Sequence, residues 1–286
     1  MSLVTRHSSL SVGCAIWAHK GWVGNFFPEK TKAADFLREY SRRLTAVEGN
    51  TTFYATPSAE TVARWVEQTP PDFKVCPKLP QTITHHKRLH DAQADTEFFL
   101  ERMSGLGERL GPLFIQLPPS FGPASFDTLA AYLDHFPRPY RVCVEVRHDG
   151  WFAPQARARL NALLRQHNAA RVSIDTRGLR AGDSDDALVN RSRERKPDVP
   201  VQPDLTADFS FVRLINNPKP ELNEPYFAEW AQRIAQWLDG GAHVFLFSHC
   251  PDETLSPVFA RDMHARITAL TAVAPLPSDV KQGTLL

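Results

Sequence analysis

The segment YRVCVEVRHDGWF (140–152) joins an apolar, β-branched run to a sudden group of charged side chains. Residues 140–146 have the residue pattern of a buried strand, rich in β-branched and apolar side chains, and Glu145, Arg147 and His148 lie at its end. Seven other runs share this pattern, and their starts lie about 30–40 residues apart, the spacing of one strand–helix unit. They are LSVGCAIW (10–17), LTAVEGN (44–50), FKVCPKL (73–79), PLFIQL (112–117), ARVSIDT (170–176), DFSFVRLI (208–215) and HVFLFS (243–248).

The stretches between these runs carry helical periodicity. In 126–136, apolar residues recur every three or four positions behind Ser125, a candidate N-cap. A second pattern starts near Asn223 and stops at Gly240-Gly241, and a third has Ser256 as cap and Pro257 at the first helical position. Weaker helical patterns are found at 32–43, 58–68, 92–106 and 155–168.

Eight strands alternating with helices predict an α/β fold, a (β/α)8 barrel of the TIM type. An open doubly wound sheet is the alternative, but no G-x-G-x-x-G follows the first strand. We expect one domain over 1–286, with a core of about 10–272 and a C-terminal tail at 273–286. The connection 177–207 has little helical period and mixed charges, which predicts a long irregular loop after strand six, either a solvated loop or a lid.

Composition excludes several classes of protein. Hydrophobic residues make up 42% and charged residues 23% of the chain, as in ordinary globular proteins. With 33 Lys and Arg against 32 Asp and Glu, bulk charge cannot hold the chain on nucleic acid. No apolar run is long enough to cross a membrane, and MSLVTRHSSLSVG (1–13) lacks the apolar core of a signal peptide, so we expect a cytoplasmic protein. The sequence carries no signal for oligomeric state.

Polar side chains follow the predicted strands at the barrel end where active sites lie. Several sit inside or directly behind an apolar run, where an unpaired charge would be costly, so we expect them to face the barrel mouth. The candidate catalytic residues are Glu48, His85, Glu145, His148 and Asp175. The candidate substrate-binding residues are Trp17, His19, Asn50, Tyr54, Lys78, Arg88, Gln116, Arg147, Trp151 and Arg213.

These candidates carry charges of both signs. They form either a self-neutralising network or an anion site in which the cations bind the ligand and a carboxylate acts as base. His85-His86-Lys87-Arg88 is either a solvated turn or an anion-binding edge, and Arg195 in the long loop is expected to be screened by water. No G-x-S-x-G, Walker A or H-E-x-x-H pattern is present, so a divalent metal stays possible but no metal ligand is predicted.

Four cysteines form no C-x-x-C pair and are expected to be buried, reduced thiols. Side chains alternate along a strand, so Cys76 and Cys143 face inward if Lys78 and Glu145 do. The predicted barrel layer is Cys14, Cys76, Cys143 and Phe211.

Four motifs together resemble the domain-of-unknown-function 72 family, also called YecE-like. They are VEGNTTFY (47–54), KLPQTITHHKRL (78–89), LGPLFIQLPPSF (110–121) and VEVRHDGWF (144–152). The resemblance runs from about Val12 to Leu270 and implies a (β/α)8 barrel similar to the xylose isomerase and endonuclease four superfamily, whose members bind divalent metals. The family pattern falls here on Glu48, Asn50, Thr52, Phe53, Tyr54, Lys78, His85, Arg88, Gln116, Glu145, Arg147, His148, Trp151 and Asp175.

Two segments depart from the family pattern. The first strand ends in AIWAHKGW instead of a Ser-Gly-Trp-like turn, and the eighth in FSHCPDET instead of a run of asparagines. Changes at two rims of the mouth suggest a subgroup with its own ligand preference.

Three functions remain in view. The first is an enzyme, a hydrolase or lyase acting on a small anionic, phosphate-bearing substrate by acid/base chemistry, with or without a metal. The second is an isomerase or epimerase of a sugar derivative, with Glu48 and Glu145 flanking the ligand. The third is a non-catalytic barrel that binds nucleic acid through 85–88 and 177–200.

Overall fold

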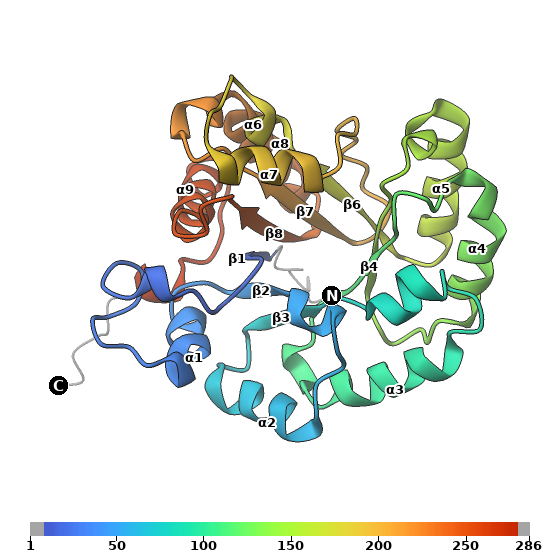
Figure 1. Ribbon diagram of the computed structural model, residues 1–286, viewed down its shortest axis with the longest axis horizontal. Coiled ribbons are helices and arrows are strands. Elements are labelled where there is room, and N and C mark those ends of the chain that lie inside the picture. The colour runs from blue at the N-terminus through green and yellow to red at the C-terminus, as the bar shows by residue number, and fades with distance from the viewer. Residues whose placement is uncertain (1–8, 280–286) are drawn as a thin grey trace, which may run out of the picture.

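The computed structural model describes residues 9–279 as eight parallel strands surrounded by helices (Figure 1). The expected tail, 273–286, is therefore described only as far as Asp279, and residues 1–8 of the segment tested for a signal peptide lie outside the described residues. The strands are β1 (Leu10–Cys14), β2 (Ala46–Gly49), β3 (Lys74–Pro77), β4 (Leu113–Gln116), β5 (Val142–Glu145), β6 (Ala170–Asp175), β7 (Phe209–Ile215) and β8 (His243–His249).

The strands pair in the order β3-β2-β1-β8-β7-β6-β5-β4. Strands β3 and β4 then meet through two isolated bridges, Val75 with Leu110 and Lys78 with Phe114, so the sheet nearly closes on itself. Every strand ends at the same side, as parallel pairing requires. The predicted (β/α)8 barrel is confirmed, and each of the eight predicted runs contains one strand.

Helices cover the outside of the barrel. They are α1 (Phe36–Ser41), α2 (Ala59–Gln68), α3 (Gln93–Ser104), α4 (Phe126–His135), α5 (Pro154–Gln166), α6 (Arg177–Arg180), α7 (Ala187–Arg195), α8 (Glu224–Asp239) and α9 (Ser256–Thr268). Ser125 occupies the N-cap position of α4, as predicted, but its side chain makes no capping hydrogen bond. The predicted cap at Ser256 is wrong, because Ser256 is the first residue of α9 and its hydroxyl donates to Glu253. Among the described residues, no helix has the length and apolarity needed to cross a bilayer.

The long connection after β6 is confirmed in length but is not irregular throughout, because it contains α6 and α7. Asp186 caps α7 by accepting the backbone N–H of Leu188. Arg193 donates to the carbonyl oxygens of Leu179 and Gly182 and so holds the two helices together. The helix was missed because side chain–backbone hydrogen bonds stabilise it, and these leave no apolar periodicity in the sequence.

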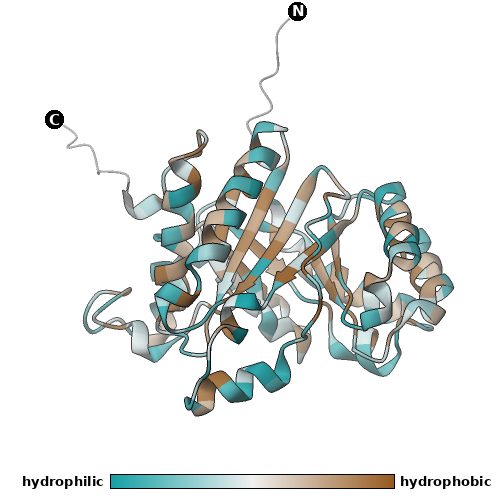
Figure 2. Cartoon of the chain, turned by 90° about the horizontal axis from the view of Figure 1, so that it is seen from above, coloured by the Kyte–Doolittle hydropathy of each residue, from teal (hydrophilic) through white to brown (hydrophobic). Residues whose placement is uncertain are grey.

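The barrel interior is filled by a cluster distinct from the outer core. Cys76, Cys143 and Phe211 belong to it, as predicted; the Phe114 ring stacks on Phe211, and the Phe247 ring packs against Phe211 at a tilt. The strands are largely hydrophobic, whereas the outer helices mix hydrophilic and hydrophobic residues (Figure 2). This is the pattern of a packed barrel core rather than a pore.

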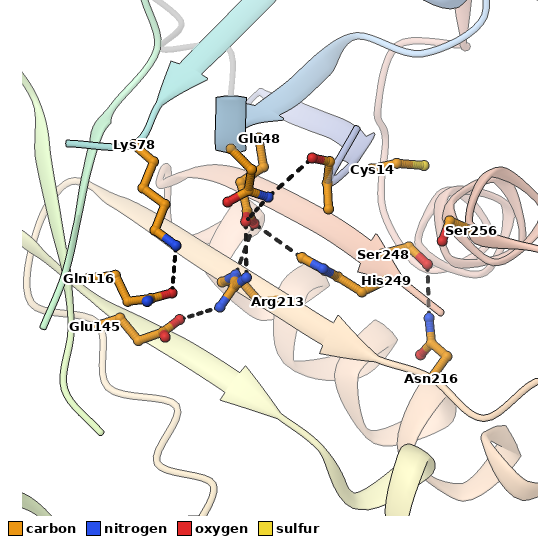
Figure 3. Close-up of polar contacts among 12 residues, drawn as sticks. Cys14, Glu48, Lys78, Gln116, Glu145, Arg213, Asn216, Ser248, His249 and Ser256 are labelled. Atoms are coloured by element: carbon orange, nitrogen blue, oxygen red, sulfur yellow. Dashed lines mark hydrogen bonds and ion pairs between the residues drawn. The ribbon is translucent and has the colours of Figure 1, made fainter. Parts of the chain in front are cut away.

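The position predicted for Cys14 is wrong. Cys14 belongs to the outer core with Val12, and its backbone N–H donates to the hydroxyl of Tyr40 from α1. Side chains alternate along β1, so both residues face the helices. Figure 3 shows the Cys14 sulfur pointing away from the charged cluster around Arg213.

We predict that a water-soluble disulfide reagent leaves Cys76 and Cys143 unmodified in the native protein. Both thiols are buried, and burial raises the pKa of each well above its ordinary value, so almost no thiolate is present at neutral pH. Absorbance of the released thiol and peptide mapping measure the reaction, and the protein unfolded in urea is the control. Rapid modification of either cysteine in the native protein would contradict the assignment to the barrel core.

Candidate functional site

A buried ion cluster closes the barrel beneath its mouth. Arg213 from β7 donates through Nε and Nη2 to the two carboxylate oxygens of Glu48 from β2, at 2.8 and 2.9 Å. Its Nη1 donates to Oε2 of Glu145 from β5. All three side chains are at most 2% exposed, and Figure 3 shows them meeting from separate strands. One guanidinium thus joins three strands.

The cluster keeps both glutamates ionised. Burial alone would raise the pKa of Glu145, but Arg213 and Arg147 outweigh burial and lower it to about 2. Burial opposes ionisation of Glu48 too, yet Arg213 and His249 hold its pKa well below the ordinary range. Burial lowers the pKa of His249 to about 4, so the ring is neutral and its Nε2 lies 3.1 Å from Oε2 of Glu48. Neither carboxylate is therefore poised to take a proton near pH 7.

A second row of polar groups lies beside the cluster. Arg147 donates through Nε to Oε1 of Glu145 at 2.6 Å and through Nη2 to Oε1 of Gln116 at 2.7 Å. The same Gln116 oxygen accepts from Nζ of Lys78 at 2.8 Å. This Nζ also lies 4.0 Å from the centre of the Phe53 ring. Two cationic side chains therefore share one neutral acceptor.

Lys78 is the residue of the row whose protonation is poised near neutral pH. Burial and the charge of Arg213 lower its pKa to about 7. The Phe53 ring opposes this by about 1 kcal/mol, which corresponds to less than one pKa unit. In the part of the chain that the structure describes, Lys78 makes no ion pair with a carboxylate. A lysine of this kind is suited to acid/base or nucleophilic chemistry.

These groups open onto a cavity of about 390 Å³ at the carboxyl ends of the strands. Five basic residues line it, and Glu253 is the one carboxylic acid among the described lining residues; the basic residues are Lys78, Arg147, Arg195, Lys196 and Arg213. Burial and Arg213 lower the pKa of Lys196 to about 8, whereas burial raises the pKa of Glu253. The cavity is therefore electropositive and holds groups that titrate away from their ordinary ranges.

Eight of the fifteen predicted site residues come together here: Glu48, Asn50, Tyr54, Lys78, Gln116, Glu145, Arg147 and Arg213. Glu48 and Glu145 lie behind Arg213 rather than on the lining. His85 sits at the edge, on the π-helical turn Thr82–His86, with its ring 5.0 Å from that of Phe53. Two aromatic residues, Phe53 and Tyr54, line the cavity.

Six predicted site residues lie elsewhere. Asp175 faces α8, where it accepts from Nε1 of Trp230 and from Arg177, because its side chain leaves β6 on the outer side. Nδ1 of His148 accepts from the backbone of Gly150 and caps the turn after β5. The other four contact neighbouring groups. The rings of Trp17 and His19 pack against Trp65 and Trp22. Arg88 donates a hydrogen bond to Ser120, and Nε1 of Trp151 donates one to the carbonyl oxygen of Phe121.

Four ionisable lining residues were not among the predicted site residues. His249 ends β8 and Glu253 follows it, so their position after a strand was an available signal. Arg195 and Lys196 come from the end of α7; Arg195 is exposed, as expected, and it also lines the cavity. Only the fold of the long connection brings these two residues to the mouth.

The cluster does not fit a divalent metal. Both oxygens of Glu48 and both of Glu145 already accept hydrogen bonds from arginines, and the Arg213 guanidinium occupies the place between them. Within residues 9–279, no three His, Cys, Asp or Glu side chains are grouped as metal ligands. We therefore derive no chemistry through a metal at this site.

We predict that Arg213→Met lowers the free energy of unfolding by on the order of 3–5 kcal/mol, because two buried carboxylates lose their counter-charge. Urea unfolding at pH 7 measures the change. The triple variant Glu48→Gln, Glu145→Gln, Arg213→Met should recover part of the loss, since no buried charge is then unpaired. A single variant as stable as the wild type would show that the cluster does not hold the barrel together.

Lys78 makes stability depend on pH at neutral to alkaline values. Its folded pKa of about 7 lies below the ordinary 10.5, so the unfolded chain binds more protons between these values. Stability contributed by Lys78 therefore rises with pH across this window, by up to about 1.4 kcal/mol per pH unit. We predict that Lys78→Met removes this share of the slope in urea unfolding between pH 7 and 9.5, while Lys74→Met keeps it. Equal slopes in wild type and Lys78→Met would refute the low pKa.

Comparison with known proteins agrees with this architecture. The family model described as "Protein of unknown function DUF72" matches residues 11–281. The UPF0759 protein YecE of Escherichia coli is 35% identical over 271 residues, which cover 93% of this chain and 97% of YecE. The UPF0759 protein YunF of Bacillus subtilis is 26% identical over 247 residues, 79% of this chain and 85% of YunF.

Two crystal structures of DUF72 family proteins share the fold. The protein from Enterococcus faecalis superposes with a TM-score of 0.68 at 17% identity and covers 96% of this chain and 99% of its own. The protein from Thermotoga maritima gives 0.65 at 22% identity, with 91% and 99% covered. With a family match over nearly the whole chain and a 35% identical relative of almost equal length, this chain belongs to the DUF72 family.

Proposed function

We propose that the protein is an enzyme that binds a small phosphate-bearing substrate in the barrel mouth and acts on it by acid/base chemistry, as a hydrolase or lyase. The observation that carries the proposal is the imbalance of charge around the cavity, where five basic residues face one carboxylic acid. The two glutamates lie behind Arg213 and are engaged by it, and Glu145 is also paired with Nε of Arg147. Among the described residues Arg195 and Lys196 make no ion pair, and Nη1 of Arg147 makes no hydrogen bond, so these three side chains are the ones that can hold an anion.

The roles within this proposal differ from those first expected. Glu48 and Glu145 hold low pKa values and have no free oxygen, so they support the site rather than act as bases. Lys78, with its pKa near 7, is the better base, and Glu253, with its raised pKa, is the better acid. Nε, Nη1 and Nη2 of Arg213 all donate hydrogen bonds to the two glutamates. Arg213 therefore orders the floor of the cavity instead of binding the ligand.

The other two functions have less support. A sugar isomerase with Glu48 and Glu145 on either side of its ligand conflicts with the guanidinium that fills this position. The hypothesis that residues 85–88 bind nucleic acid has less support, because Lys87 is paired with Asp95 and Arg88 is hydrogen-bonded to Ser120. A cavity of about 390 Å³ has the size of a small-molecule site.

Calorimetry with inorganic phosphate tests the proposal. Arg147→Ala should weaken phosphate binding at least tenfold, since a hydrogen bond to a charged group is worth about 1.5–3 kcal/mol. Lys196→Ala should weaken it similarly, and Arg195→Ala less, because its exposed side chain is screened. Arg64→Ala, on the exposed face of α2, removes one positive charge at a residue outside the cavity lining and is the control.

Two results would overturn the proposal. The first is no heat of binding for phosphate at any concentration up to 10-fold above that of typical metabolites, about 10 mM. The second is an equal loss of affinity in Arg147→Ala and Arg64→Ala, which would place binding on the general surface.

A further inference from the structure

We propose that Lys78 forms an imine with the carbonyl carbon of an aldehyde or ketone that also carries the phosphate. The inference deepens the proposed function and rests on it for the anionic group of the substrate. It begins from the position of one amine, which lies at the cavity wall where β3 ends.

The surroundings of Lys78 favour an unprotonated amine. Its one hydrogen-bond acceptor among the described residues is Oε1 of Gln116, and Arg147 donates to the same oxygen. Arginine does not give up its proton in proteins, so lysine is the partner that can. A neutral amine donates one N–H to Gln116 and keeps its lone pair free. The pKa of Lys78, lowered to about 7 by burial and Arg213, agrees with this geometry.

The walls of the cavity suit a carbonyl compound with an anionic end. Phe53 and Phe114 place aromatic rings 4.0 and 5.5 Å from Nζ and limit the access of water to the amine. Arg147 and Lys196 line the same cavity and are placed to bind the phosphate. An amine activated by burial and by neighbouring cations is the arrangement that nucleophilic lysines use.

The step balances without an oxidant or a metal. The lone pair of Nζ attacks the carbonyl carbon, a C–N bond forms, and the oxygen takes a proton to give a carbinolamine. The hydroxyl then takes a second proton, the C–O bond breaks, and the group departs as water. A C=N bond forms in its place, and over the two stages the nitrogen gives up the two protons that it carried as an amine. Glu253, the carboxylic acid of the lining with a raised pKa, is the candidate proton donor for the loss of water. Protonated again on nitrogen, the imine accepts the electron pair of an adjacent C–H bond, and the carboxylate left on Glu253 after its proton donation takes the proton.

Reductive trapping tests the inference. The full chain is incubated with dihydroxyacetone phosphate at pH 7.5 and treated with sodium borohydride, which reduces an imine to a stable secondary amine. Intact mass spectrometry should show one adduct per chain, and peptide mapping should place it on Lys78. Lys78→Met and Lys78→Arg should lose the adduct, whereas Lys74→Met, at the opposite end of β3, should retain it. Thermal unfolding confirms that each variant is folded.

The outcomes separate the inference from the proposed function. No adduct on Lys78, or adducts spread over surface lysines, overturns imine formation, and phosphate binding by calorimetry then still supports the proposed function. An adduct on Lys196 alone also overturns the role given to Lys78. An adduct on Lys78 that forms equally fast with unphosphorylated dihydroxyacetone, and that 10-fold excess inorganic phosphate does not suppress, supports the imine and overturns the phosphate site.

Discussion

The guanidinium of Arg213 is the group around which the mouth of this barrel is organised. Two buried carboxylates from β2 and β5 meet it, and its charge is the largest of the effects that keep both of them ionised at that depth. Arg213 and Arg147 together neutralise the two carboxylates, so Lys78 lies beside the cluster without a carboxylate partner among the described residues. The electropositive cavity and the unusual lysine both follow from this one pairing.

Much of the fold was readable from the sequence because strand and helix periods alternate cleanly, and every apolar run became a strand. The floor of the site was readable for a related reason. Glu48, Glu145 and Arg213 interrupt or end apolar runs, and a barrel offers such side chains few places other than its mouth. Cys14 shows the limit of that reasoning, because β1 has no charged residue to fix which of its faces points inward.

The rest depended on contacts between distant segments. Asp175 has the same sequence texture as Glu145, but Trp230 and Arg177 on the outer side of β6 receive its carboxylate. His148 and Trp151 were credible site residues that instead fold the turn after β5. Lys196 gave no signal, because its place at the cavity is set by α6 and α7, which backbone-directed arginines hold together.

The segment formed by α6 and α7 has its own small apolar cluster, in which Leu179 and Val189 meet Ile174 and Ile215, separate from the main core. Such a unit can unfold locally without exposing the barrel interior. One wall of the cavity is thus supplied by a segment whose local unfolding would not require the barrel to open. The observed affinity of any ligand that touches Lys196 is then its intrinsic affinity multiplied by the fraction of molecules in which this segment is closed, so hydrogen exchange in 177–196 and occupancy of the cavity are thermodynamically linked.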